Sequence, residues 1–108
     1  MKYISLYNNQ LQLLCTKYKV KQMYAFGSVL TEKFSSNSDI DLKISMLDNL
    51  SALEYGENVL ALWNELELLF NRPVDLLTEE TIQNPFLKKE IEQTQILVYD
   101  RENEKVFI

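Results

Sequence analysis

Two aspartates in the stretch NSDIDLKIS could bind a metal ion. Asp39 and Asp41 are separated by one residue, and they alternate with the apolar residues Ile40, Leu42 and Ile44. This alternation predicts a β-strand with one apolar face, on which residues i and i+2 point the same way about 6.5–7 Å apart. Two such carboxylates repel each other unless solvent or a cation lies between them, and Mg²⁺ prefers oxygen ligands. The alternative is that Asp39 caps a turn and Asp41 is a solvated strand residue.

A Gly-Ser pair before the aspartates could hold a phosphate group. An apolar run ends at Phe26 and is followed by Gly27 and Ser28, in a chain with only two glycines. Glycine lets the backbone approach an anion closely, and the free N–H groups of a following helical turn point at that anion. Serine adds a hydroxyl donor. Taken alone, Gly27 is more typical of an ordinary turn at the end of a strand.

The hydrophobic pattern predicts the elements that must position these residues. The predicted helices cover residues 3–17, with a break near Asn8, and residues 50–71 and 84–94, with a short helical turn at 28–33. The predicted strands cover residues 20–26, 39–45, 73–78 and 95–99, and residues 100–108 form a tail in which KVFI could add a short strand. Asn84 is the expected cap of the last helix, and Pro85 is its first residue. This order predicts one domain, residues 1–108, with an α+β fold (an α/β sandwich): helices packed on a mixed four-stranded sheet.

Composition excludes several classes of function. The 108 residues include no histidine, so histidine-based zinc sites and Ser-His-Asp catalysis are excluded. The net charge of −5 argues against direct binding of nucleic acid. Cys15 is the only cysteine, so no intrachain disulfide can form; its place on an apolar helix face predicts core packing. No apolar run approaches the ~20 residues of a membrane span, and a cytoplasmic protein is expected.

The two motifs together resemble a known signature. Gly27-Ser28, ten intervening residues and then Asp39-Ile40-Asp41 are similar to the motif of the polymerase-β-type nucleotidyltransferase superfamily. In size and layout the chain resembles the minimal nucleotidyltransferases (MNT), which are often encoded beside HEPN-domain partners. The resemblance covers most of the chain and implies the mixed nucleotidyltransferase sheet.

The resemblance also implies a third carboxylate, on the strand after the long helix. The sequence offers Asp75, between Val74 and Leu76. An aspartate among apolar residues is costly to bury without a partner, so either a shared metal site or exposure at a strand edge is needed. The resemblance implies that Asp75 joins Asp39 and Asp41 in holding two Mg²⁺ ions, and that Asp75 helps to activate the attacking hydroxyl as a base.

The same resemblance implies the substrate. ATP or another nucleoside triphosphate would bind with its β- and γ-phosphates at Gly27 and Ser28. Many members carry an arginine three residues after the serine and then a glycine, but this chain has Thr31 and Glu32 there. Lys33 is the candidate that supplies positive charge instead. The alternative for Lys33 is a solvated surface position.

Three functions follow as hypotheses. The resemblance implies a nucleotidyltransferase that transfers AMP to a hydroxyl of a HEPN partner by two-metal in-line displacement, and so acts as an antitoxin. The second hypothesis is a catalytically silent module that neutralises or scaffolds a partner by contact, which Thr31 and Glu32 favour. The third is modification of a small molecule, as by aminoglycoside nucleotidyltransferases, in which a homo-oligomer or partner would complete the pocket.

Overall fold

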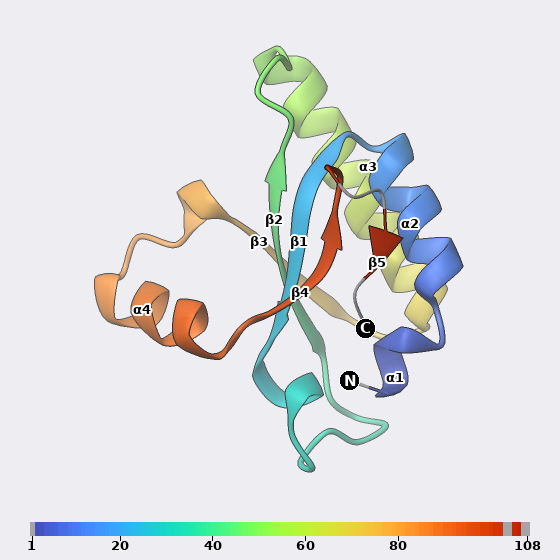
Figure 1. Ribbon diagram of the computed structural model, residues 1–108, viewed down its shortest axis with the longest axis vertical. Helices are drawn as coiled ribbons and strands as arrows, with labels where there is room; N and C mark the ends of the chain where they lie inside the picture. The colour runs from blue at the N-terminus through green and yellow to red at the C-terminus, as the bar shows by residue number, and fades with distance from the viewer. Residues whose placement is uncertain (1, 103–104, 107–108) are drawn as a thin grey trace.

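The computed structural model describes residues 2–102 and 105–106 (Figure 1). Its helices are α1 (Lys2–Ser5), α2 (Asn8–Lys17), α3 (Ala52–Phe70) and α4 (Pro85–Thr94), with the short 3₁₀ turns η1 (Gly27–Leu30) and η2 (Glu79–Thr81). Its strands are β1 (Val20–Phe26), β2 (Ile40–Met46), β3 (Val74–Thr78), β4 (Ile96–Asp100) and β5 (Lys105–Val106). The predicted α+β architecture is confirmed.

The strands form one mixed sheet in the order β3-β2-β1-β4-β5. Strands β2 and β3 are parallel, and the other neighbouring pairs are antiparallel. The four predicted strands are all present, and β5 extends the sheet within the stretch predicted to be mainly a tail. Because parallel neighbours need a crossover, the long helix α3 connects β2 to β3 and brings their starts to the same end of the sheet.

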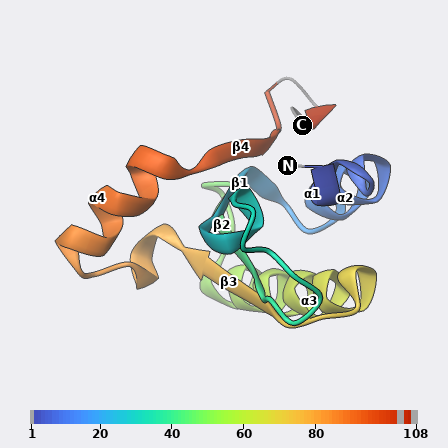
Figure 2. The ribbon, with the colours of Figure 1, turned by 90° about the horizontal axis from the view of Figure 1, so that it is seen from below.

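The helices α2 and α3 lie on one side of the sheet, and α4 lies on the other side (Figure 2). The alternation of β2 explains this arrangement, because Ile40, Leu42 and Ile44 are fully buried in the core that also contains Leu62 of α3. Cys15 is buried there too, as predicted, and burial raises the pKa of its thiol to about 12. Within residues 2–102 and 105–106, no helix is long and apolar enough to cross a membrane.

Element boundaries depend on local capping. The helix predicted at residues 3–17 is two helices, because the chain leaves the helical ladder at Leu6 and Tyr7, just before the predicted break. Ser51 and Glu54 form a capping box at the start of α3. The predicted cap of α4 is present, because the Asn84 side chain accepts hydrogen bonds from the N–H groups of Phe86 and Leu87.

The loop before β2 is held by the end of α3. The guanidinium of Arg72 donates hydrogen bonds to the carbonyl oxygens of Ser35 and Ser38, at 2.9 and 3.0 Å. The backbone N–H of Ile40 donates to the carbonyl oxygen of Pro73 at 3.1 Å. These bonds fix the segment that contains Asp39 against the start of β3.

Candidate active site

The parallel ladder places two of the three predicted carboxylates side by side. Asp41 on β2 and Asp75 on β3 are direct partners in the register of the two strands. Asp41 is partly buried, whereas Asp75 is exposed on an edge strand of the sheet. Asp39 is also exposed, and it precedes β2 instead of belonging to it, which corrects the predicted strand of residues 39–45. The two acidic side chains on neighbouring strands therefore come from segments that are joined by the whole of α3.

Gly27 approaches the Asp41 carboxylate directly. The φ angle of Gly27 is +76°, a region that side chains disfavour, and this turn begins η1. A Cβ atom added to Gly27 would collide with Oδ2 of Asp41 and would lie 3.2 Å from its Cγ. Phe26, the residue before the turn, is the register partner of Asp41 across β1 and β2. Glycine is thus required here both by the backbone conformation and by the space that Asp41 occupies.

The surroundings of Asp41 disfavour its ionised form when no cation is bound. Burial raises the pKa of Asp41 above its ordinary value, and the neighbouring charges of Asp75 and Asp39 raise it further. A cation that relieves the repulsion would lower this pKa and keep the carboxylate ionised. The three side chains thus offer oxygen ligands whose mutual repulsion a hard divalent ion would reduce.

The donor set fits Mg²⁺, although the described part of the chain holds no preassembled ligand group. Among those residues, no three or more carboxylate or thiol side chains already stand in an arrangement that could hold a metal ion. Mg²⁺ commonly binds to one or two carboxylates and completes its shell with water and substrate phosphate. The neighbouring pair Asp41 and Asp75 meets that requirement. Asp39 has an exposed side chain and lies just before β2, outside the backbone hydrogen bonds of that strand.

The turn after Ser28 is closed by the residue that replaces the family's arginine. The hydroxyl of Thr31 donates a hydrogen bond to the carbonyl oxygen of Ser28 at 2.9 Å and accepts one from the N–H of Lys33 at 3.2 Å. Glu32 and Lys33 are exposed on the same turn. Thr31 therefore stabilises the shape of the Gly27-Ser28 turn, and the structure leaves the Lys33 side chain in an exposed position.

Sequence reasoning missed one charged residue on this face of the sheet. Lys43 follows Asp41 by two residues on β2 and is only 4% exposed. Its Nζ lies 3.5 Å from Oε1 of Glu79 in η2 and 4.9 Å from the centroid of the Tyr24 ring. The signal was available, because the alternation that places Asp41 on the polar face also places Lys43 there.

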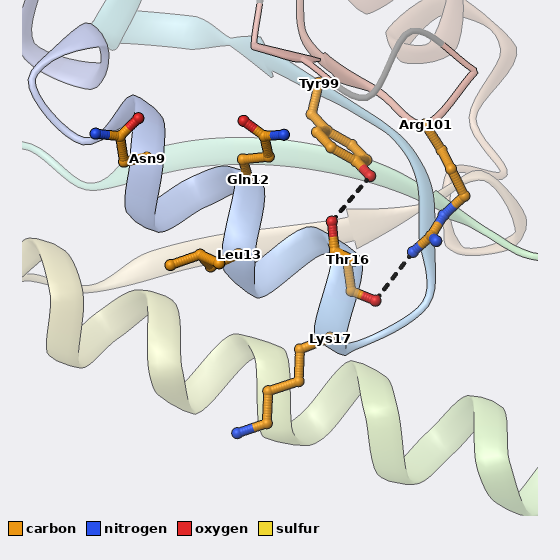
Figure 3. Close-up of a pocket in the computed structure, with 7 residues that line it drawn as sticks. All are labelled: Asn9, Gln12, Leu13, Thr16, Lys17, Tyr99 and Arg101. Carbon is orange, nitrogen blue, oxygen red and sulfur yellow. Dashed lines mark hydrogen bonds between the residues drawn. The ribbon is translucent and has the colours of Figure 1, made fainter.

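A cavity of about 690 Å³ lies elsewhere, between α2 and the end of β4 (Figure 3). Tyr99 and Thr16 are joined across it by their hydroxyl groups at 3.4 Å. Arg101 donates hydrogen bonds to the carbonyl oxygens of Cys15, Thr16 and Val20 at 2.7–3.1 Å. Since its guanidinium binds carbonyl groups near the end of α2, we assign Arg101 a role in the fold.

Known proteins are similar to this chain in sequence. The family model described as Polymerase beta, Nucleotidyltransferase matches residues 9–104. A Methanocaldococcus jannaschii protein described as "Putative protein adenylyltransferase" is 39% identical over 87 residues, which cover 81% of this chain and 85% of the relative. A second protein of that organism with the same description is 39% identical over 82 residues, with coverages of 76% and 80%.

Solved structures show the same fold at lower identity. The chain matches a structure described as "Structure of putative minimal nucleotidyltransferase" with a TM-score of 0.64 and 23% identity, over 88% of this chain and 92% of that one. A toxin–antitoxin structure with AMP-PNP matches with a TM-score of 0.64 and 21% identity, over 89% and 76% of the two chains. A complex of a tri-AMPylated Shewanella oneidensis HEPN toxin with its MNT antitoxin matches at 0.59 and 20%, over 93% and 75%. With its Gly-Ser turn against an aspartate pair and its match over residues 9–104, this chain belongs to the polymerase-β-type nucleotidyltransferase family.

Proposed function

We propose that this chain is a Mg²⁺-dependent adenylyltransferase that transfers AMP from ATP to a hydroxyl group of a HEPN-type protein partner, and so acts as an antitoxin. The observation that carries the proposal is the contact of Gly27 with the Asp41 carboxylate, beside Asp75 on the neighbouring strand. This contact supports the proposal, because the turn expected to hold phosphate approaches one of the carboxylates expected to bind metal. The descriptions of the archaeal relatives and of the structural neighbours support the choice of AMP and of a protein acceptor.

In the proposed reaction the chain's own residues bind and orient the substrate. Gly27 and Ser28 hold the β- and γ-phosphates, with Lys33 as the candidate for further positive charge, while Asp39, Asp41 and Asp75 would hold two Mg²⁺ ions. These ions, when bound, would stabilise the attacking and leaving oxygens of an in-line displacement.

The bonds that change are those of the α-phosphorus. The acceptor oxygen forms a bond to the α-phosphorus, the bond from that atom to the bridging oxygen breaks, and the electron pair leaves with pyrophosphate. The proton of the acceptor hydroxyl passes to the carboxylate of Asp75 and then to solvent. The product is an AMP ester of the acceptor.

A contact-only function is the second candidate, and the turn after Ser28 favours it. Thr31 uses its hydroxyl within the turn, and Glu32 adds a negative charge close to the proposed phosphate site. Under this candidate the chain neutralises its partner by binding alone. The two candidates differ in what Asp41→Asn does: it abolishes neutralisation if AMP transfer is required, and it leaves neutralisation intact if contact is sufficient.

The test uses ATP labelled with ³²P at the α-phosphate. Purified protein and its Asp41→Asn variant are incubated with Mg²⁺ and a lysate of the host, or with any partner that co-purifies. We expect one labelled protein band that requires Asp41, and mass spectrometry then identifies the modified side chain. If no nucleotide triphosphate labels a confirmed partner, the transfer function is wrong and the contact-only function replaces it.

A further inference from the structure

A buried lysine two residues after Asp41 on β2 has no role in the function proposed above. Within the described residues, Lys43 and Thr78 are the buried polar side chains, at 4% and 7% exposure. Lys43 lies on β2 between the core residues Leu42 and Ile44, so its side chain points to the opposite face, where Asp41 lies. The Cα atoms of Asp41 and Lys43 are about 6.6–6.8 Å apart along the strand.

The fold alone does not call for an ammonium group at this position. Lys43 faces Tyr24 on β1 and Leu77 on β3 in the register of the sheet, and an apolar side chain would suit these neighbours. Its ionic partner Glu79 is 46% exposed, so the pair joins a desolvated cation to a half-solvated anion. Replacing such a buried charge by an apolar side chain of similar volume is often neutral or stabilising. The charge therefore needs an explanation beyond stability.

The arrangement of charges on this face suggests that explanation. Asp39, Asp41 and Asp75 are negative. Lys33, the one cation within the described residues 27–33 of the Gly-Ser turn, is the candidate for the β- and γ-phosphates, so the α-phosphoryl group is left without one. The turn lies at the end of the sheet where β1 stops and β2 starts (Figure 1). Lys43 lies two residues after Asp41 on β2, further from that end. If the β- and γ-phosphates bind at the turn, Lys43 is on the side of Asp41 that faces away from them.

We propose that Lys43 is a further catalytic residue of the proposed transfer reaction, whose ammonium stabilises the negative charge on the α-phosphoryl group and the attacking oxygen. This inference rests on the function proposed above. Charge at the reacting phosphorus develops during transfer, and a preorganised donor in a site that excludes water is most effective there. The ammonium lies 3.5 Å from Oε1 of Glu79 and 4.9 Å from the centroid of the Tyr24 ring, and its contact with Tyr24 does not depend on Glu79.

The test separates catalysis from ATP binding and from folding. Lys43→Met removes the charge but keeps an unbranched side chain, Lys43→Arg keeps a charge, and Glu79→Gln removes the ion pair but keeps the lysine. For each variant we would measure kcat and KM for ATP in the labelling assay, the Kd for fluorescent TNP-ATP, and the melting temperature. Removal of one stabilising group of this kind typically lowers kcat about 10²–10³-fold.

We expect Lys43→Met to lose about 10²-fold in kcat, with little change in the Kd for TNP-ATP and no fall in melting temperature. Lys43→Arg should recover part of the activity, and Glu79→Gln should retain most of it. The proposal is overturned if Lys43→Met keeps its kcat, or if Glu79→Gln loses as much kcat as Lys43→Met, since the lysine then acts through the ion pair. Failure of the wild type to label its partner or to bind TNP-ATP would instead overturn the proposed function, and this inference with it.

Discussion

The two glycines of this chain should respond in opposite directions to the same substitution. In Gly27→Ala the new Cβ would collide with Oδ2 of Asp41, at a residue whose φ angle is +76°. The backbone conformation alone costs about 1–2 kcal/mol, and forcing an extra carbon into a packed site typically costs about 1–3 kcal/mol more. In Gly56→Ala, within α3, the new Cβ meets nothing within 4 Å. Alanine in a helix interior is favoured over glycine by about 0.5–1 kcal/mol.

Thermal unfolding measures these differences. For a domain of this size 1 kcal/mol corresponds to about 4 °C in melting temperature, so Gly27→Ala should lower it by about 8–20 °C. Gly56→Ala should raise it by about 2–4 °C and leave AMP transfer unchanged. Gly27→Ala should also lower transfer about 10²-fold or more at a temperature where it is folded, because a catalytic group displaced by about 1 Å can cost that factor. Equal melting temperatures for the two variants, or full transfer by Gly27→Ala, would refute the close approach of Gly27 to Asp41.

Two further predictions concern Asp41 and the start of α3. Burial and the charges of Asp75 and Asp39 raise the pKa of Asp41, so the folded protein binds this proton more tightly than the unfolded chain does, and stability falls as pH rises through the folded-state pKa. Asp41→Asn should therefore raise the melting temperature at pH 7, and a lower melting temperature for this variant would contradict the reasoning. Added Mg²⁺ should raise the melting temperature of the wild type only, and this increase should become smaller as the pH is lowered through the pKa of Asp41. Ser51→Ala removes the capping box with Glu54 and should lower the free energy of unfolding by about 1 kcal/mol, or the melting temperature by about 4 °C, without loss of AMP transfer. An unchanged melting temperature in calorimetry would show that the cap does not stabilise α3.

The fold was largely predictable because its local signals agree with its packing. The bounds of β1 match residues 20–26, and Asn84 caps α4 as its amide and the following Pro85 suggest. The break between α1 and α2 was placed only approximately, because no proline or glycine marks it. The start of β2 was misplaced by one residue, since an alternating pattern cannot show that the ladder begins at the N–H of Ile40.

The sequence nominated the carboxylates of the candidate site, whereas their contacts could only be seen in the structure. The spacing of Asp39 and Asp41 and the resemblance named the carboxylates, but the pairing of Asp41 with Asp75 depends on the register of two strands joined through α3. Lys43 was overlooked because a lysine on a polar strand face is normally solvated. Its burial results from tertiary contacts with Tyr24 and Glu79, which no local pattern encodes.

The parallel pairing of β2 and β3 also determines when the site can form during folding. The antiparallel pair of β1 and β2 brings Phe26 to Asp41 through residues 27–39, whereas Asp75 pairs with Asp41 only after the longer crossover through α3 has closed. Contacts that are distant in sequence form slowly, because loop closure costs entropy before any contact compensates for it. In a refolding experiment, the pairing of Asp41 with Asp75 should therefore form after the contact between the Gly27 turn and Asp41. A chain whose synthesis stops before β3 would contain the Gly27-Ser28 turn and Asp41 but would lack Asp75.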